Sequence, residues 1–516
     1  MSRTIAVVGS GFAGSILARV LALQGHRVTL IDRARHPRFA LGESATPLAA
    51  LSLERLARRW RLDDLDRLAA YGRWTSGLPE LRHGLKRGFT FYAHRRGAAY
   101  VNGEHDEHRL LVAASPNDEI ADSHWVRADV DAHLAKEAAA AGAELLAACS
   151  ISSLEPRRDG FALGLETSVG AHRRLEVDAV VDGSGRGGFL SRHLPAAARL
   201  SPTETTSLIA GHYRGVRSFV DVASAAGASL GDGPYPDEKA AVHHLLDDEW
   251  LYVLPFDDGT ASAGLVSRRG GGDLAQRLAH YPTLARCFAD AERISPRVEI
   301  ATLPYRSRSA AGDRWALLPA TYAFDDPLFS TGIAWSLVAV ERLADWGAAL
   351  AANADDEAQH RLRRYGDLLR LEADHLRRLI AAAWATLADF DGFAARALYY
   401  FAAASFCEAR QRLCDGAGCW DAFLAADDPL VATWWRSADP TATVAEVRQR
   451  IAPRDVAGIG DPSHGRRIPA TIEPLLAAGP KLGLDPAELQ RRLGRIRGLG
   501  LADHGSTAAR ALPTGS

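Results

Sequence analysis

The sequence is poor in cysteine and has no long apolar run. Its five cysteines are scattered and odd in number, which is typical of a reducing compartment, so we expect a cytoplasmic protein. Cys414 and Cys419 are too few for a zinc site and no Cys/His cluster joins them, so we expect no metal. The chain lacks a stretch of about 18 apolar residues, so we expect no membrane-spanning helix. The net charge of −2 gives no reason to expect nucleic acid or an anionic membrane as a partner.

Lysine is also scarce, because only four of the 61 basic residues are lysines and the rest are arginines. A bias this strong should have replaced the lysines that only carry a solvated charge. A lysine that persists is therefore a better candidate than usual for chemistry that arginine cannot perform. Lys86 is such a candidate, because it begins the aromatic segment 86–94, which predicts a strand.

The first 32 residues have the pattern of a dinucleotide-binding unit. The apolar run 5–8 predicts a buried parallel strand, 15–23 a helix and 27–31 a second strand. The turn Gly9-Ser10-Gly11-Phe12-Ala13-Gly14 joins the first strand to the helix, and Asp32 ends the second strand. A tight turn in another α/β protein would explain the glycines alone, but it would not require an acidic residue at this place.

Each part of this pattern has a physical role in binding a pyrophosphate. The three glycines allow a tight turn, close approach of the backbone to the phosphates, and close packing of the helix on the strand. The amide groups at the start of the helix point toward the phosphates, and the acidic residue accepts hydrogen bonds from a ribose hydroxyl. The expected cofactor-binding residues here are Gly9, Gly11, Phe12, Ala13, Gly14 and Asp32.

Two later strands indicate that the chain returns to the same sheet. Residues 177–181 predict a buried strand that ends in a second glycine turn, Asp182-Gly183-Ser184-Gly185. Residues 316–318 predict a last buried strand, which leads into the segment 324–332. A helix is expected to begin in that segment, near Ser330.

The remaining regions divide into helix and strand. Residues 125–141 predict a helix, and residues 205–265 are mostly β, with 250–256 pairing against 262–267. From about residue 355 the apolar residues repeat every three to four positions, which is typical of long amphipathic helices.

The segments 9–14, 182–185 and 324–332 together resemble the flavin-dependent halogenases, which share the FAD monooxygenase fold. The last segment fits the family pattern Phe-x-x-Pro-x-x-Ser-x-Gly. Trp250-x-Tyr252-x-Leu254-Pro255 is a conservative version of the family's Trp-x-Trp-x-Ile-Pro. Lys86 stands in a Lys-x-Gly-x-x-Phe context, where the family has its active-site lysine.

The resemblance implies an α/β fold class. We expect a Rossmann-like FAD-binding domain of the flavin monooxygenase (PHBH) type, an inserted, mostly β substrate domain, and a C-terminal helical region. The expected bounds are 1–80, 110–200 and 300–350 for the discontinuous FAD-binding domain, 81–109 and 201–299 for the substrate-side sheet, and 351–516 for the helical region with its loosely packed tail.

The resemblance also implies an activity in secondary metabolism. FADH2 and O2 would form a flavin hydroperoxide that oxidises chloride or bromide to hypohalous acid, and Lys86 would hold or relay the electrophile. The substrate would be an electron-rich aromatic such as a phenol or pyrrole, free or tethered to a carrier protein. A guanidinium is diffuse and hardly nucleophilic, so arginine would replace Lys86 poorly. No second glycine fingerprint for NAD(P)H is visible, so a separate flavin reductase is expected.

The implied site residues fall into three groups. The loop 37–47 is similar to the family loop that follows the second strand, and further FAD contacts are expected at Arg38, Gly42, Glu43, Ser44, Ala45, Arg127, Asp182 and Ile333. The halide is expected at the backbone amides of Thr331 and Gly332, because a helix start has positive potential. The expected substrate or tunnel residues are Trp250, Tyr252, Pro255, Phe329, Ser330 and Trp335.

Two positions depart from the family pattern. The family has Gly-Asp at the end of the last strand, where the carboxylate holds the ribityl chain, but Pro319-Ala320 stands at or next to that place. We therefore expect weak FAD binding. Phe329 stands where tryptophan-directed members have a glutamate that accepts the ring proton, so we expect free tryptophan not to be the substrate.

Other interpretations fit parts of the same pattern. An FAD hydroxylase or monooxygenase would need neither a halide site nor a lysine. An FAD-dependent reductase or dehydrogenase on a lipid-like or polyketide substrate, or a flavoprotein relic without activity, would also keep the glycine turns. In these cases Lys86 is a surface lysine, Arg127 a helix-surface charge, and Trp250 and Tyr252 are core residues.

Overall fold

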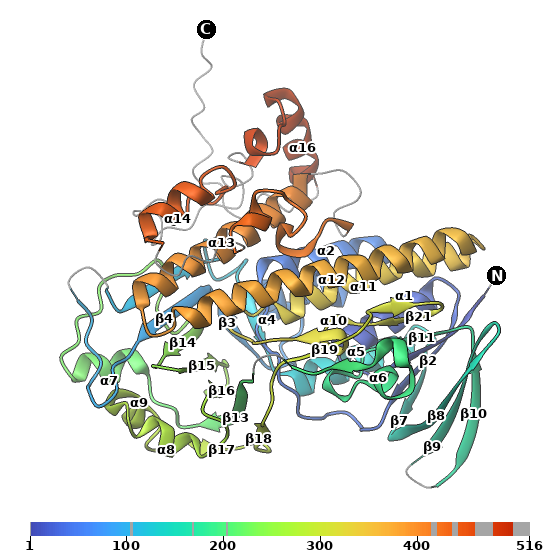
Figure 1. Ribbon diagram of the computed structural model, residues 1–516, viewed down its shortest axis with the longest axis horizontal. Helices are drawn as coiled ribbons and strands as arrows, with labels where there is room; N and C mark the ends of the chain where they lie inside the picture. Colours follow the sequence, from blue (N-terminus) through green and yellow to red (C-terminus); the bar gives the residue numbers. More distant parts are fainter. Residues whose placement is uncertain are drawn as a thin grey trace.

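Two β-sheets lie side by side, and the long helices α11, α12 and α13 lie above them in the view of Figure 1. The structure is a computed structural model. It describes residues 2–103, 107–167, 170–202, 205–413, 420–435, 442–459 and 478–498, and of residues 496–498 it describes the backbone alone. The predictions for Cys414, Cys419 and the end of the tail fall outside these residues.

A six-stranded sheet forms the half of the molecule that contains the N-terminus. Its strand order is β20-β21-β11-β1-β2-β7, and all neighbours are parallel except β20 and β21. The bounds are Thr4–Val8 for β1, Arg27–Asp32 for β2, Glu144–Ala147 for β7, Ala179–Asp182 for β11, Ala311–Gly312 for β20 and Trp315–Leu317 for β21. The central strands are buried, which agrees with the continuous apolar runs of the sequence.

The ends of three central strands meet at one edge of this sheet. Val8 is paired with Ile31 on one side and with Asp182 on the other. The amide of Gly9 donates to the Ile31 carbonyl at 2.7 Å, and the amide of Gly183 donates to the Val8 carbonyl at 2.7 Å. Gly9 has a φ of 98°, and a Cβ there would lie 2.4 Å from the Gly183 carbonyl oxygen. The two glycine turns therefore touch, and no larger residue fits between them.

Helices cover the six-stranded sheet. The helix expected over 15–23 begins earlier, at Phe12, and a Cβ on Gly14 would lie 2.0 Å from the Gly9 carbonyl oxygen, so helix and strand pack closely. The helix expected over 125–141 begins at Arg127, because Trp125 belongs to a strand. The helices packed around this sheet are α1 (Phe12–Leu23), α2 (Pro47–Trp60), α5 (Arg127–Ala140) and α11 (Gly332–Ala351).

The second large sheet has the order β17-β13-β16-β15-β14-β4-β5, with β18 paired to β13. The predicted pairing of the tryptophan strand is confirmed, because Trp250 of β15 opposes Val266 of β16 in an antiparallel ladder. The bounds are Gly88–Ala93 for β4, Arg109–Ala113 for β5, Ser207–Arg214 for β13, Ala241–Leu245 for β14, Glu249–Pro255 for β15, Thr260–Ser267 for β16, Glu292–Arg293 for β17 and Val298–Ile300 for β18.

The single strand predicted for residues 86–94 is wrong, because the chain changes sheets within it. β3 (His83–Lys86) pairs only with β6 (Asp122–Trp125) in a two-stranded ribbon, whereas β4 belongs to the large sheet. The break falls at Arg87, whose amide donates to the Lys239 carbonyl at 2.7 Å. A Cβ on the following residue, Gly88, would lie 2.1 Å from the Val112 carbonyl oxygen, so glycine permits the close approach of the strands.

The C-terminal helices cover both sheets. The apolar helix face predicted after residue 355 is buried, and Leu362 and Leu369 are examples. Their bounds are Asp355–Ala385 for α12, Phe390–Leu413 for α13, Val444–Ile451 for α14 and Pro486–Gly498 for α16. The shorter helices are α3 (Asp63–Leu68), α4 (Tyr71–Gly77), α6 (Phe189–His193), α7 (Phe219–Ala225), α8 (Leu274–Leu278), α9 (Pro282–Cys287) and α10 (Pro319–Tyr322). Two small sheets contain β8 (Cys149–Arg157), β9 (Gly160–Thr167) and β10 (His172–Val177), and β12 (Arg199–Leu200), β19 (Tyr305–Ser307) and β22 (Ala323–Phe324).

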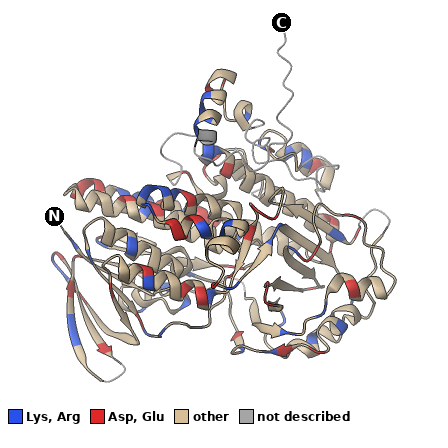
Figure 2. Ribbon diagram, turned by 180° about the vertical axis from the view of Figure 1, so that it is seen from behind, with Lys and Arg blue, Asp and Glu red and all other residues tan. Residues whose placement is uncertain are grey.

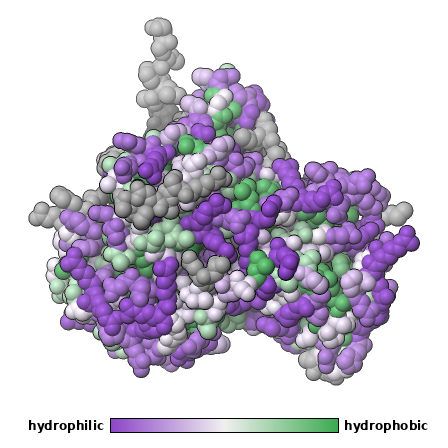
Figure 3. Space-filling view, viewed as in Figure 1, coloured by the Kyte–Doolittle hydropathy of each residue, from purple (hydrophilic) through white to green (hydrophobic). Residues whose placement is uncertain are grey.

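The surface carries mixed charge. Figure 2 shows acidic and basic residues interspersed along the long helices, and Figure 3 shows a largely hydrophilic face with small separate apolar areas. No helix in the described ranges has the length and apolarity of a membrane span. Within the same ranges, no three His, Cys, Asp or Glu side chains are grouped to hold a metal ion.

Candidate active site

A cavity of about 490 Å³ lies where the two large sheets meet the C-terminal helices. Its walls come from the start of α1, the loop 38–44, Arg127, the glycine turn 183–186, strand β15 and the segment 323–336. These segments are far apart in the sequence, and they come together where the strand ends of the six-stranded sheet face strand β15 of the second sheet. The cavity therefore lies where the sequence predicted the cofactor.

The predicted cofactor residues divide into those that line the cavity and those behind its wall. Lining residues are Gly11, Phe12, Ala13, Gly14, Arg38, Gly42, Glu43, Ser44, Arg127 and Ile333. Gly9, Asp32, Ala45 and Asp182 are not in the lining. Asp182 instead holds the glycine turn that lines the cavity. Its buried carboxylate accepts hydrogen bonds from the amides of Ser184 and Leu190 at 2.9 and 2.7 Å.

Asp32 is held by its neighbours at the end of β2. One oxygen accepts bonds of 2.9 Å from the amide and the hydroxyl of Ser10, and the other accepts one of 2.9 Å from the Ala34 amide. Burial acts to raise the pKa of Asp32, but the bonds from Ala34 and Ser10 and the charge of Arg38 outweigh it, so the pKa lies below its ordinary value. The carboxylate is therefore ionised and able to accept a ribose hydroxyl.

Arg127 joins helix α5 to the start of α1. Its guanidinium makes two 2.9 Å bonds to Asp131, and it donates to the carbonyls of Leu41 and Gly42 at 3.0 Å. Asp131 in turn accepts a 3.1 Å bond from the Phe12 amide. The sequence analysis gave no role to Asp131. Its spacing four residues after Arg127 on a helix is the signal that could have found it.

The predicted halide position is open to the cavity. Thr331, Gly332 and Ile333 line it, and apart from Gly332's chain neighbours and the adjoining helix backbone no atom of the described residues lies within 4 Å of a Cβ built on Gly332. The chain reaches α11 through Ser330, which has a left-handed φ of 52°. The Thr331 side chain does not cap the helix, so the amides of its first turn are available to an anion.

Lys86 is fully buried behind the cavity wall and does not line the cavity. Its ammonium donates a 2.5 Å hydrogen bond to the Ala45 carbonyl and lies 4.1 Å from the centre of the Phe89 ring. Burial lowers the pKa of Lys86 to about 8, although the charge of Asp122 acts to raise it. Ser44, the residue before Ala45, lines the cavity, so the loop 43–46 separates the lysine from it.

The predicted tunnel residues also divide. Trp250, Tyr252, Ser330 and Trp335 line the cavity, whereas Pro255 and Phe329 do not. The Trp335 indole donates to the carboxylate of Glu372 at 2.7 Å.

Glu372 is fully buried and gathers several donors. Besides Trp335 it accepts bonds of 3.1 and 2.6 Å from Arg342 and one of 2.7 Å from the Phe423 amide. Glu372 thereby fixes one wall of the cavity to α12. Sequence analysis missed it, because a glutamate on an amphipathic helix has the same pattern as a solvated one.

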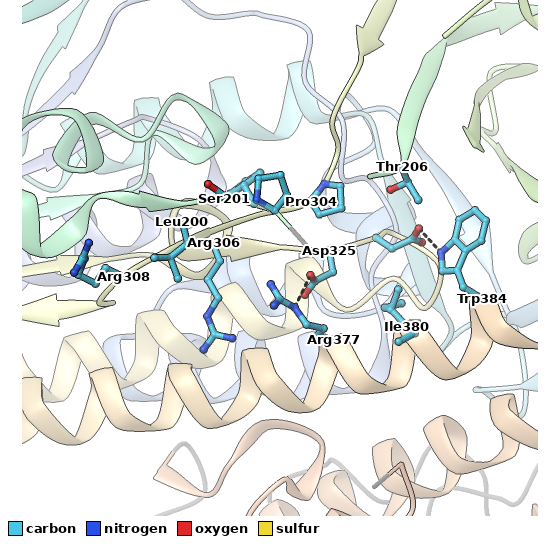
Figure 4. A pocket seen from close by; sticks show the side chains of 14 residues that line it. Leu200, Ser201, Thr206, Pro304, Arg306, Arg308, Asp325, Arg377, Ile380 and Trp384 are labelled. Atoms are coloured by element: carbon cyan, nitrogen blue, oxygen red, sulfur yellow. Dashed lines mark hydrogen bonds and ion pairs between the residues drawn. The ribbon is translucent and has the colours of Figure 1, made fainter. Parts of the chain in front are cut away.

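A second cavity of about 260 Å³ adjoins the first along α12 and is shown in Figure 4. Tyr305, Asp325, Asp326 and Ile380 line both cavities. The Trp384 indole donates to Asp326 at 3.0 Å, and burial raises the pKa of this carboxyl to about 7. The two cavities are therefore neighbours that share part of their walls.

Comparison with known proteins agrees with this geometry. Residues 4–218 match the family model of FAD dependent oxidoreductases. This match includes the glycine turns at 9–14 and 183–185 that border the cavity.

Three curated relatives are halogenases. Monodechloroaminopyrrolnitrin halogenase PrnC of Pseudomonas fluorescens is 26% identical, over 75% of this chain and 68% of that protein. Tetracycline 7-halogenase of Kitasatospora aureofaciens is 25% identical, over 69% of this chain and 65% of that protein. A 1H-pyrrole-2-carbonyl-[peptidyl-carrier protein] brominase of Pseudoalteromonas luteoviolacea is 23% identical, over 67% and 77%.

A solved structure shares nearly the whole fold. The halogenase PltM in complex with phloroglucinol and FAD superposes with a TM-score of 0.79 at 23% identity, covering 90% of this chain and 99% of that one. The chain is therefore a homologue of the flavin-dependent halogenases with their FAD-binding fold.

Proposed function

We propose that this chain is an FADH2- and O2-dependent halogenase that chlorinates or brominates an electron-rich aromatic ring. One observation carries the proposal: a single cavity joins the FAD-binding segments, the open start of α11 and the aromatic residues of β15, with Lys86 enclosed directly behind its wall. Bound reduced FAD, together with O2, supplies the oxidising equivalents that convert a halide to hypohalous acid.

The chain offers a distinct region for each part of the cofactor. We propose that the start of α1 and Arg127 hold the pyrophosphate, that Asp32 holds the ribose, and that the turn 183–185 lies along the ribityl chain. Residues 1–80, 110–200 and 300–350 would then serve as the FAD-binding part, and 81–109 with 201–299 as the substrate side. The helical residues from 351 close the site over both.

Lys86 is proposed as the residue that takes up the electrophile. Its amine is fully buried, which favours the neutral, nucleophilic form because desolvation penalises the charge. The halide would bind at the amides of Thr331 and Gly332, on the opposite side of the cavity wall. Trp250, Tyr252 and Trp335 would shield the reactive intermediate from water.

The site and the relatives support a substrate class. Phe329 cannot accept a proton, which favours a ring activated by its own hydroxyl or nitrogen. PltM has been solved with phloroglucinol, and one curated relative acts on a carrier-bound pyrrole. We therefore propose a phenol or pyrrole, free or carrier-tethered. The reduced flavin would come from a separate reductase. Three buried free cysteines, Cys149, Cys287 and Cys407, fit a reducing cytoplasm.

A hydroxylase is the second candidate, and a specific observation favours it: Lys86 does not line the cavity. The experiment that separates the two supplies the protein with FAD, a flavin reductase, NADH, O2 and a panel of phenols and pyrroles. Product masses are compared in chloride and in bromide. The proposal predicts masses that change with the halide, whereas a hydroxylated product in both salts would contradict it.

A further inference from the structure

Asp122 is a buried carboxylate without the hydrogen bonds that such a group normally has. It lies on β6 and is 4% exposed. Its Oδ2 has no hydrogen-bond partner among the described residues. A buried carboxylate oxygen without a partner is costly, so its retention suggests a role other than stability.

The residue directly opposite Asp122 in the β3–β6 ladder is Lys86. Directly opposed residues of an antiparallel pair project their side chains to the same face, a few ångströms apart. Within the described part of the chain, no carboxylate oxygen lies within 4.0 Å of the Lys86 ammonium, which donates to the Ala45 carbonyl instead. The amine and the acid are therefore neighbours that are not locked into an ion pair.

The other ionisable groups around this pair do not compete for its proton. His124 of β6 and His243 of β14 have their pKa values lowered to about 3, first by burial and then by further interactions that include the charge of Lys86. Burial raises the pKa of Tyr400 on α13, so its phenol stays protonated. Glu408, also on α13, accepts a 2.8 Å bond from Arg412.

The remaining proton acceptor for Lys86 is Asp122. Burial raises the pKa of the Asp122 carboxyl to about 7, although the charge of Lys86 acts to lower it. Burial lowers the pKa of Lys86 and raises that of Asp122, so the two pKa values lie closer together than in water and a proton moves between the groups at a smaller cost.

We propose that Asp122 is the proton partner of Lys86: it holds the resting amine as an ammonium ion and accepts that proton when the amine attacks hypohalous acid. The inference rests on the proposed halogenase function. In the first step an N–X bond forms and the O–X bond of HOX breaks. Ammonium, carboxylate and HOX give the N-haloamine, water and the protonated Asp122.

The second step returns the pair to its starting state. The ring carbon takes the halogen, the N–X bond breaks, and its electron pair stays on nitrogen. The nitrogen then takes two protons, one from the ring and one from Asp122, so the ammonium and the carboxylate are restored. The ring proton thus goes to the Lys86 nitrogen, and Asp122 is again able to accept a proton in the next turnover. Because it acts through Lys86, it is a positioning residue.

The scarcity of lysine makes a direct test practical. Full-length protein labelled with [ε-13C]lysine gives four signals, and each can be titrated from about pH 5 to about pH 11. We expect the Lys86 signal to titrate near 8 in the wild type. In Asp122→Asn the attraction that favours the ammonium is lost, so the Lys86 pKa should fall by about one to three units. The acid limb of the halogenation rate, which in the wild type follows the ionisation of Asp122, should in the variant follow the lowered pKa of Lys86.

Two further variants serve as controls. Asp118 forms an exposed 3.0 Å ion pair with Lys239, so Asp118→Asn should leave both the Lys86 signal and the rate profile unchanged. Asp122→Glu keeps a carboxylate and should keep Lys86 near its wild-type pKa. If Asp122→Asn does not fold, the wild-type protein alone still tests the proposal. A Lys86 signal that titrates in one step at the ordinary lysine pKa of about 10.4 would overturn it.

The outcomes separate this inference from the function on which it rests. An unchanged Lys86 pKa in Asp122→Asn, or a rate profile that does not follow a changed pKa, would overturn the proton partnership. A Lys86 pKa that depends on Asp122, in a protein that gives no halogenated product, would support the partnership and reject the proposed function.

Discussion

The hydroxyl of Tyr400 donates a 2.8 Å hydrogen bond to the carbonyl of Phe329, and the two rings stack with their centroids 4.6 Å apart. Helix α13 is thereby fixed to the segment that leads into α11. The Phe329 side chain is 1% exposed and lies among further aromatic rings, including Phe393. The position before Ser330 is therefore filled by an apolar ring that has no access to the cavity.

This arrangement predicts the ring selectivity of the enzyme. Position 329 holds a phenylalanine and therefore offers no carboxylate to accept a proton from an unactivated ring. Free tryptophan should thus be halogenated at least about a hundredfold more slowly than a phenol or pyrrole. Competition between the substrates in one reaction, followed by mass spectrometry, measures the ratio. Efficient chlorination of free tryptophan above that of the phenols would contradict the interpretation of this segment.

FAD binding should be weak and should improve with one substitution. Ala320 lines the cavity in the first turn of α10, whereas Pro319 is buried behind it. Ala320→Asp places a carboxylate where a ribityl hydroxyl can donate to it, so the dissociation constant should fall about tenfold. Fluorescence titration with FAD measures the change, and Ala352→Asp at the far end of α11 is the control. A wild-type protein whose addition leaves FAD fluorescence unchanged would refute the cofactor assignment.

We expect reduced flavin to come from a separate reductase. The turn 182–185 lacks the spacing of a second nucleotide fingerprint, so the chain offers no obvious place for NADPH. We expect the purified protein with FAD to oxidise NADPH no faster than a heat-treated sample. Absorbance at the NADPH band measures this, and rapid oxidation by the protein alone would overturn the need for a reductase.

Glu372 should be among the residues that matter most for stability. Glu372→Ala removes the acceptor of the Trp335 indole and of the Phe423 amide inside the protein, so the free energy of unfolding should fall by about 3–5 kcal/mol. Thermal melting measures the loss. Glu357→Ala, which removes an exposed partner of Arg361, should change the melting temperature little. Equal effects of the two substitutions would count against the buried network.

The dinucleotide half of the fold is predictable from the sequence because its signals are local. The glycine turn at 9–14, the strand before it and Asp32 are contiguous, and each has one physical interpretation. The return of the chain to this sheet at 182–185 and 316–318 is predictable for the same reason, because each strand and the segment after it are contiguous in the sequence. Trp250 and its pairing partner strand were found because a hairpin joins neighbours in the sequence.

The less predictable parts depend on contacts between distant segments. The ribbon that sets Lys86 against Asp122 joins residues 36 positions apart, and the break at Arg87 lies inside an unbroken aromatic pattern. The enclosure of Phe329 depends on Tyr400, 71 residues later. Sequence patterns indicate which residues are buried, but they do not say which distant side chain each one meets.

The central claim is that the amine of Lys86 carries the halogen. Lys86→Arg retains the positive charge but removes the nucleophile, and Lys86→Ala removes both. Both variants should lose halogenated product while FAD binding and oxygen-dependent peroxide release stay near wild type, because those depend on the six-stranded half of the molecule. Lys136→Arg is the matched control and should behave as wild type.

The decisive measurement is the mass of the product in chloride and in bromide, for the wild type and the Lys86→Arg variant, with a flavin reductase supplied. We predict halide-dependent masses from the wild type and none from the variant. Halogenated product from Lys86→Arg at the wild-type rate would contradict the account.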